Sequence, residues 1–333
     1  MKRPEGDGPG VRPTVWFMTT GEPGSRQQAR GLAEAISPTP REVQVRVNQL
    51  RTLVPHALLG GSLIGVSEAS GRLAPPWPDV LISCGRRSAL ASLAIARRNP
   101  APMITAHIQP PPSPHAFDLV VTLPHDRLRG ANVLRLNTAL HTMRPETLRA
   151  AADAKDARFT GLPRPWIGVL LGGSRRRAPF TRGQAEQLAD ALEARRHSLG
   201  GSILITPSRR SPAEAMAVLR DRFAQHPAAF LWDGRPPNPY LPLLALSDEL
   251  VVTGDSISMI SEALATTATV WVFAVEAGPR HNRFVAHLAG LGLLATLGDP
   301  HPPVHRSVGV DAMPIAAEAV RGLMQVKLST AAA

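Results

Sequence analysis

The stretch LVVTGDSISMISEALATT, residues 250–267, reads as a buried strand, a sharp turn and a helix. Leu250, Val251 and Val252 form a short, partly β-branched apolar run, which is typical of a strand buried on both faces. Residues 253–256, TGDS, then interrupt the run with types that favour turns and helix caps. The segment therefore indicates one strand–turn–helix unit of a parallel α/β sheet.

The start of this helix carries polar groups that suit a ligand. Ser258 and Glu262 are four residues apart, so they share one helical face. The amino end of a helix offers unpaired N–H groups and a positive dipole end, which favour a phosphate or a sugar hydroxyl. Serines that only cap the helix are the alternative, because such caps are common.

Similar units surround this segment in the second half of the chain. Strands are predicted at 166–171, 202–206, 229–232 and 269–275, and helices at 181–197, from 211 onward, 241–246, from 258 onward and 280–290. The helix from 211 onward has Ser211 as its expected cap, Pro at its first position and Glu at its third. The carboxyl ends of successive parallel strands converge on one crevice, where ligands bind.

The residues at these strand ends have the chemistry of a nucleotide-diphosphate site. Glycines let the backbone approach a phosphate, arginines supply charge, and a carboxylate can accept ribose hydroxyls. A plain turn with a solvated basic tail is the alternative for residues 172–177. The candidate binding residues are Gly172, Gly173, Ser174, Arg175, Thr206, Ser208, Arg209, Arg210, Asp233, Asn238, Asp255, Ser256, Ser258, Met259 and Glu262.

The first half repeats the alternation of strands and helices. Strands are predicted at 14–19, 42–47, 79–83, 103–108, 117–123 and 132–136, and helices at 26–36, 89–98 and loosely within 51–76. The glycine loop at 21–25 lacks the dinucleotide spacing G-x-G-x-x-G. His125 and Asp126 follow a strand and could act as a general base with its orienting carboxylate, or could be solvated loop residues.

Length and composition restrict the class of protein. The 333 residues suggest about two domains. Their predicted bounds are a disordered tail at 1–13, an acceptor-side domain at 14–155, a nucleotide-sugar domain at 156–305, and a C-terminal helix (313–327) and tail at 306–333. Apolar runs fall short of the roughly 20 residues of a membrane helix, and the N-terminus resembles neither a signal nor a transit peptide, so a cytoplasmic location is expected.

Charge and residue usage point to an anionic partner. The formal net charge is +11, and nearly all of the basic residues are arginines. An anionic substrate, or a peripheral contact with an acidic membrane surface, fits this charge. Aromatic residues are only 4%, which argues against a single-stranded nucleic-acid platform, so no nucleic acid is expected. Cys84 is the single cysteine, which excludes an internal disulfide and a cysteine-based zinc site.

Three segments carry a resemblance to a known family: FDLVVTLPHDRLRGANVLRLNTALHTM (117–143), TPSRRSP (206–212) and NPYLPLLALSDELVVTGDSISMISEA (238–263). Together they resemble the bacterial relatives of the plant mitochondrial-fission Elm proteins, over roughly residues 15–292. The resemblance implies a GT-B-like fold, α/β with two Rossmann-like parallel-sheet domains facing a cleft. The second half is also similar to the glycosyltransferase MurG, which implies Gly172, Gly173 and Ser174 at the donor phosphates and Glu262 at the ribose.

The first glycine loop departs from the family pattern. The resemblance implies His or Asp after the second glycine of this loop, where the chain has Ser25. The candidates that remain for a catalytic base are Glu22, His125 and Asp126.

The sequence thus predicts an inverting glycosyltransferase that uses a nucleotide-diphospho-sugar as donor substrate and no further cofactor. An Asp-x-Asp motif is missing, so no metal is expected. An anionic lipid or a polysaccharide of the envelope could be the acceptor, and the protein could lie at the periphery of the inner membrane. The competing hypothesis is a non-catalytic scaffold with the GT-B fold. The resemblance to the plant proteins suggests it, because those relatives are described as recruiters of a dynamin-type GTPase. A sugar-nucleotide epimerase is the weaker alternative, since G-x-G-x-x-G and a Tyr-x-x-x-Lys pair are lacking.

Overall fold

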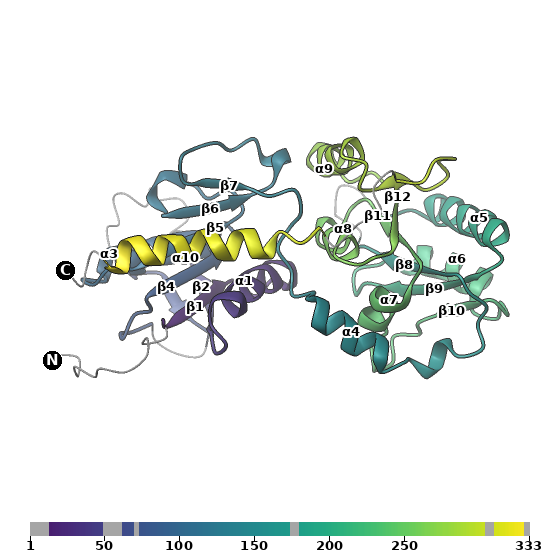
Figure 1. Ribbon diagram of the computed structural model, residues 1–333, viewed down its shortest axis with the longest axis horizontal. Coiled ribbons are helices and arrows are strands. Elements are labelled where there is room, and N and C mark those ends of the chain that lie inside the picture. The colour runs from purple at the N-terminus through teal and green to yellow at the C-terminus, as the bar shows by residue number, and fades with distance from the viewer. Residues whose placement is uncertain (1–12, 49–61, 70–72, 174–179, 304–309, 330–333) are drawn as a thin grey trace.

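Two α/β lobes form the protein, seen side by side in Figure 1. The structure is a computed structural model that describes residues 13–48, 62–69, 73–173, 180–303 and 310–329. The predicted tail at 1–13 therefore lies almost entirely outside the described residues. Each lobe is built on one sheet, and the predicted class, α/β with two Rossmann-like parallel-sheet domains, is confirmed.

The first sheet has seven strands in the order β3-β2-β1-β4-β5-β6-β7. All neighbouring pairs are parallel except β2 and β3. The strands are β1 (Val15–Thr19), β2 (Arg41–Val47), β3 (Val66–Glu68), β4 (Val80–Cys84), β5 (Ile104–Ile108), β6 (Leu119–Thr122) and β7 (Val133–Arg135).

Helices cover both faces of this sheet, which explains its continuous apolar strands. In β1, Val15 and Phe17 face α1 (Pro23–Ile36) and α10 (Met313–Ser329), whereas Trp16 and Met18 face the side covered by α3 (Arg86–Arg98). The C-terminal helix α10 thus returns to the first lobe (Figure 1). Short 3-10 turns, η2 (Pro114–Ala116) and η3 (Pro124–Asp126), flank β6.

The second sheet has six parallel strands in the order β10-β9-β8-β11-β12-β13. Its strands are β8 (Trp166–Leu171), β9 (Ser202–Pro207), β10 (Ala229–Leu231), β11 (Glu249–Thr253), β12 (Thr269–Phe273) and β13 (Ala295–Thr296). The order changes direction at β8, so β9 and β11 leave a switch point between their carboxyl ends. Residues 250–267 therefore occupy the centre of the second lobe.

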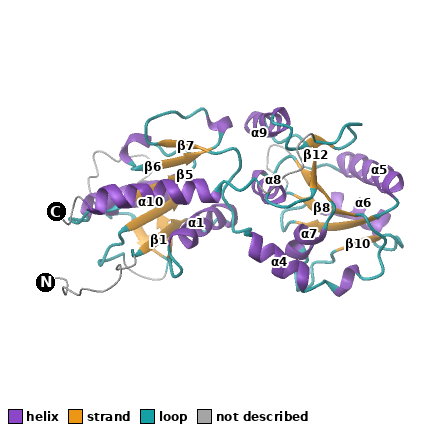
Figure 2. Ribbon diagram, in the orientation of Figure 1, coloured by secondary structure: helices purple, strands orange, loops and turns teal. Residues whose placement is uncertain are grey.

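Helices again pack on both faces of the second sheet (Figure 2). One face is covered by α5 (Arg182–Leu199) and α6 (Ala213–Phe223), and the other by α7 (Tyr240–Leu246), α8 (Ile257–Leu264) and α9 (Pro279–Gly290). The segment between the lobes contains α4 (Pro145–Asp153) and η4 (Ala157–Phe159), and α4 packs on α7. The domain bounds stay predictions.

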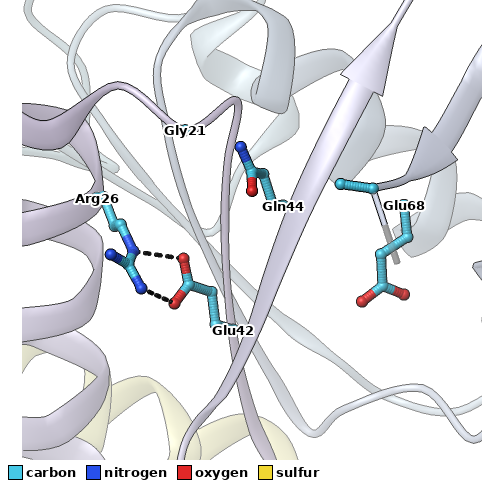
Figure 3. A pocket seen from close by; sticks show the side chains of 6 residues that line it. Gly21, Arg26, Glu42, Gln44 and Glu68 are labelled. Atoms are coloured by element: carbon cyan, nitrogen blue, oxygen red, sulfur yellow. Dashed lines mark hydrogen bonds and ion pairs between the residues drawn. The ribbon is translucent and has the colours of Figure 1, made fainter. Parts of the chain in front are cut away.

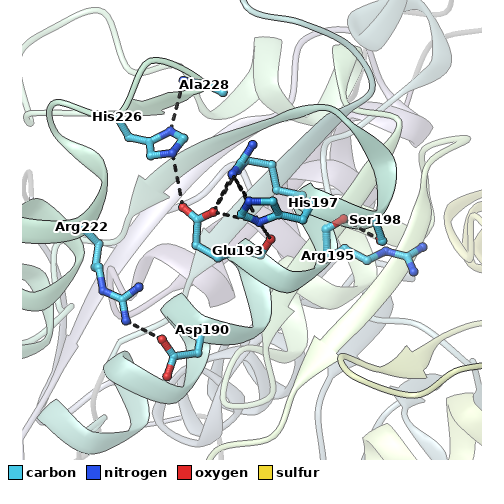
Figure 4. Close-up of polar contacts among 9 residues, drawn as sticks. Asp190, Glu193, Arg195, His197, Ser198, Arg222, His226 and Ala228 are labelled. Atoms are coloured by element: carbon cyan, nitrogen blue, oxygen red, sulfur yellow. Dashed lines mark hydrogen bonds and ion pairs between the residues drawn. The ribbon is translucent and has the colours of Figure 1, made fainter.

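Charged side chains link α5 to α6 on the outer surface (Figure 4). Asp190 pairs with Arg222, and Glu193 Oε1 lies 3.6 Å from His226 Nε2. A second imidazole, that of His197, also contacts the Glu193 carboxylate, and its side chain is 72% exposed. The pair of Asp190 with Arg222 is largely exposed and adds little stability, so Arg222 supplies a control position rather than part of a site.

Two local predictions were wrong. The helix expected within 51–76 is replaced, where the structure describes it, by β3, whose Glu68 pairs with Arg41 of β2 at 2.9 Å; residues 51–61 and 70–72 lie outside the described residues. Ser211 does not cap α6, because Pro212 is the N-cap residue and the Ser211 hydroxyl donates to the Gly172 carbonyl at 3.0 Å. The predicted capping bond thus becomes a link between two strand-end turns.

Candidate functional site

The glycine pair after β8 lies at the switch point of the second sheet. The Gly172 N–H donates to Thr253 Oγ1 at 2.7 Å. A Cβ at Gly172 would lie 2.4 Å from Asp255 Oδ1, and one at Gly173 would lie 2.3 Å from Arg210 Cβ. Neighbouring atoms would therefore have to shift to accept a side chain at either position. The structure therefore brings three of the predicted strand-end turns together, those that follow β8, β9 and β11.

The turn after β9 is folded by its own serines. Ser208 N donates to the Leu171 carbonyl and to Ser211 Oγ, both at 3.0 Å, and Arg210 N donates to Ser208 Oγ at 3.2 Å. These bonds leave Arg209 and Arg210 exposed at the end of the strand. Thr206 is buried near the end of β9, and its hydroxyl has no hydrogen-bond partner among the described residues. The turn thus offers two guanidinium groups to an anion.

Helix α8 begins beside these turns and faces the first lobe. Ser256 caps the helix, because its hydroxyl accepts from Met259 N at 3.4 Å. The Ser258 hydroxyl lies 3.5 Å from the position that a Cβ at Gly24 would take. Ser261 Oγ accepts from Ala139 N at 2.9 Å and donates to the Ile257 carbonyl. The amino end of α8 therefore lies at the junction of the two lobes.

Glu262 is buried in the second turn of α8, with 6% of its surface exposed. The Tyr240 hydroxyl donates a short hydrogen bond to Glu262 Oε2. Burial raises the pKa of Glu262 to about 7, although the bond from Tyr240 lowers it. Burial and the neighbouring carboxylate raise the pKa of Tyr240, so the phenol stays the donor. The sequence pattern gave no indication of this pair. Tyr240 and Glu262 are 22 residues apart and lie on different helices, so no local periodicity relates them.

The remaining predicted binding residues divide into two groups. Asp233 and Asn238 are exposed and have local hydrogen bonds: Asp233 Oδ1 accepts from Arg235 N and Asn238 Oδ1 from Tyr240 N, each at 2.9 Å. Asn238 therefore orders the start of α7. Ser174 and Arg175 lie outside the described residues.

A polar cavity of about 390 Å³ opens in the first lobe beside the glycine loop (Figure 3). Its lining residues are Gly21, Arg26, Glu42, Gln44, Glu68 and Ala69. Arg26 donates to both Glu42 oxygens at 2.6 Å. Glu22 follows Gly21 as the N-cap residue of α1, and its carboxylate accepts from Thr20 Oγ1 at 2.5 Å. Sequence reasoning missed Glu42 and Gln44, although alternation in 41–47 places both on the less buried face of β2.

His125 and Asp126 lie in a contact between η3 and α9. Both side chains are nearly fully buried, and the imidazole packs edge-on against Phe284 with 5.5 Å between ring centroids. Burial lowers the pKa of His125, and the charges of Arg280 and Arg283 lower it further against the opposing effect of Asp126. The imidazole is therefore neutral, as a general base must be. However, its contact with α9 encloses it and leaves no exposed surface for an acceptor.

Two largely parallel sheets whose carboxyl-end loops meet at one junction define a two-domain protein of the GT-B-like class. Solved structures of similar fold include S. aureus MnaA with UDP and the UDP-GlcNAc 2-epimerase of Methanocaldococcus jannaschii, each with a TM-score of 0.51. They are 12% and 9% identical and cover 93% and 94% of this chain and 87% and 99% of their own. At these identities the likeness concerns the fold alone.

The chain belongs to the mitochondrial fission ELM1 family, which matches residues 23–324. This confirms the resemblance to the Elm proteins. It is 31% identical over 223 residues to mitochondrial fission protein ELM1 of Arabidopsis thaliana, a match that covers 60% of this chain but only 52% of the plant protein. It is 22% identical over 296 residues to an uncharacterised protein of Rickettsia prowazekii, covering 78% of this chain and 82% of that protein. Within the described ranges, no helix has the length and apolar character needed to cross a bilayer.

Proposed function

We propose that this protein binds a nucleotide-diphospho-sugar at the carboxyl edge of the second sheet and transfers the sugar by an inverting, metal-independent mechanism. The observation that carries the proposal is the contact among the turns after β8, β9 and β11, where Gly172, Arg210 and Asp255 lie together. The amino end of α8 and two exposed arginines beside it favour a diphosphate. Glu262 would accept hydrogen bonds from the ribose hydroxyls.

In this mechanism the first lobe supplies the acceptor side. A base there takes the proton of the acceptor hydroxyl while that oxygen forms a bond to the anomeric carbon. The bond from the anomeric carbon to the diphosphate breaks, and Arg209 and Arg210 stabilise the charge that develops on the leaving group. Glu22 is the favoured base among the three candidates, because α9 encloses His125 and Asp126 pairs with Arg280. An envelope lipid or a polysaccharide would be the acceptor.

A thermal-shift screen against UDP, GDP, ADP, CMP and their sugars, beside NAD, tests the binding step. A ligand of the native state raises the melting temperature by mass action. We expect one nucleoside diphosphate and its sugars to raise it, and calorimetry to give weaker binding in Glu262→Ala and in the double variant Arg209→Ala, Arg210→Ala. Arg222→Ala is the matched control, since this arginine pairs with Asp190 on the outer surface. Equal affinity in all variants would contradict the site.

The competing proposal is a non-catalytic scaffold that keeps the GT-B-like fold and recruits another protein at a membrane. The observation that favours it is the match to the plant protein named for mitochondrial fission. The burial of His125 also fits a scaffold, because it removes the one histidine among the candidate bases from contact with an acceptor. In the thermal-shift screen, a flat response to every nucleotide would favour the scaffold over the transferase.

A sugar-nucleotide epimerase is the third proposal. The absence of two dinucleotide-enzyme sequence patterns argued against it. Of the two structures of similar fold, however, one is named as a UDP-GlcNAc 2-epimerase and the other is a complex with UDP. An epimerase can therefore have a fold similar to that of this chain. Incubation with UDP-GlcNAc and no acceptor separates the proposals: epimerisation at C2 without an acceptor would favour the epimerase.

A further inference from the structure

The first residue of α7 and the second turn of α8 meet at one partly buried hydrogen bond. The Tyr240 hydroxyl donates to Glu262 Oε2. The start of α7 is itself fixed, because Asn238 Oδ1 accepts from Tyr240 N and Leu243 and Leu244 are buried against the second sheet. The bond therefore joins the ordered start of α7 to the second turn of α8.

The carboxylate of Glu262 uses only one of its oxygens in this bond. Oε1 has no hydrogen-bond partner among the described residues. A fully buried oxygen in that position would be unsatisfied, and Oε1 is not one of the unsatisfied buried atoms, so it keeps contact with solvent. The adjacent Ser261 is tied to Ala139 of the first lobe, which holds this part of α8 at the junction. One oxygen is thus fixed, and the other keeps the small solvent contact of a residue that is 6% exposed.

We propose that Tyr240 is a positioning residue that holds Glu262 through Oε2 and so presents Oε1 to the ribose hydroxyls of the bound nucleotide. The proposal rests on the proposed nucleotide site and adds to it a ribose-specific contact. A ligand with both ribose hydroxyls gains hydrogen bonds to the carboxylate that a 2′-deoxy ligand lacks. Tyr240 thereby becomes a determinant of selectivity for ribose over 2′-deoxyribose in the nucleotide, although it does not touch the ligand.

The same bond affects the charge of Glu262. Burial raises the pKa of this carboxyl to about 7, and the Tyr240 hydrogen bond opposes the rise. Removal of the phenol hydroxyl must therefore raise the pKa of Glu262 further. The carboxylate that accepts the ribose hydroxyls would then form only at higher pH, so a loss of binding caused by Tyr240→Phe must shrink as pH increases.

The test compares Tyr240→Phe with the wild type by calorimetry, using whichever of UDP, GDP or ADP the thermal-shift screen selects, and its 2′-deoxy form. At about pH 7 we expect Tyr240→Phe to weaken binding of the ribonucleotide about tenfold, as one lost charge-assisted hydrogen bond allows. The affinity ratio of variant to wild type should move toward one between about pH 7 and about pH 9 as the variant carboxyl ionises, and titration of the ligand phosphate cancels in this ratio. The 2′-deoxy form should be affected less.

Ser247→Ala is the matched control, because it removes one hydroxyl that donates to the Leu243 carbonyl at the opposite end of α7. We expect this variant to leave both affinities unchanged. A loss in Tyr240→Phe that is equal at every pH and for both ligands would overturn the proposal and leave the nucleotide site intact. Failure of the wild type to bind any of the three diphosphates would overturn the site itself, and the role of Tyr240 with it.

Discussion

Asp126 Oδ1 lies 2.9 Å from Arg280 Nη2, and this ion pair joins η3 of the first lobe to α9 of the second. Two further bonds support the contact: Arg283 donates to the His125 carbonyl at 3.5 Å, and His287 Nε2 lies 3.0 Å from Asn137 Oδ1. The Asp126 side chain is 5% exposed, whereas that of Arg280 is 46% exposed. The two lobes are thus held by a contact whose acidic partner is buried.

Arg280→Ala should loosen this contact. The substitution leaves a buried carboxylate without its cation, which is costly, although the exposed guanidinium limits the loss to about 1 kcal/mol. We expect hydrogen exchange in η3 and α9 to accelerate relative to the strands of either sheet. Arg182→Ala is the control, since its pair with Glu186 is exposed on both sides. Unchanged exchange in η3 would show that the ion pair does not hold the lobes.

Gly172→Ala should disturb the candidate site and destabilise the protein. The new Cβ would lie 2.4 Å from Asp255 Oδ1, so the Asp255 carboxylate or the glycine turn must move. Overpacking of this kind costs about 1–3 kcal/mol, which urea unfolding would measure. Gly183→Ala is the matched control: its Cβ meets no atom within 4 Å, and the position is helical. Gly183→Ala should leave the free energy of unfolding unchanged or raise it by up to about 1 kcal/mol. Equal losses of stability in the two variants would contradict the packing argument.

The sequence predicted the sheets better than the site. Apolar strands such as 166–171 and 202–206 were placed to within a residue, because burial on both faces leaves a continuous pattern. Antiparallel β3 was missed, since three residues give no periodicity and its pairing partners Val45–Val47 in β2 lie about 20 residues earlier in the chain. The bond between Tyr240 and Glu262 was also missed, because side-chain contacts between helices depend on packing that one sequence does not encode locally.

Cys84 should resist thiol reagents in the native protein. Burial raises the pKa of its thiol to about 12, with a hydrogen bond from Ser25 opposing and the charge of Glu22 adding to the rise. At about pH 8 the thiolate fraction is then roughly a thousandfold below that of an exposed cysteine. Labelling with a thiol reagent should therefore require urea, and its onset should follow unfolding. Cys84→Ser gives the background, and rapid stoichiometric labelling without urea would contradict the prediction.

Three buried histidines should make the protein labile to acid. Burial lowers the pKa of His107 to about 3 and also lowers the pKa of His125 and of His141. In the unfolded chain each imidazole takes up a proton near pH 6.5, so the stability present above that pH is lost as the pH falls. Each neutral imidazole contributes about 1.4 kcal/mol per pH unit to this slope. Urea unfolding between about pH 7.5 and about pH 5 would measure it.

Two variants separate the contributions to the acid slope. His107→Asn should reduce the slope by one proton, whereas His301→Gln should leave it unchanged, because His301 is 89% exposed. Glu262 acts in the opposite direction: its pKa is raised to about 7, so between about pH 4.5 and 7 the folded state loses stability as pH increases. Glu262→Gln removes this opposing effect and should steepen the loss of stability in acid. A slope that is the same in His107→Asn and the wild type would mean that His107 is protonated in the folded protein.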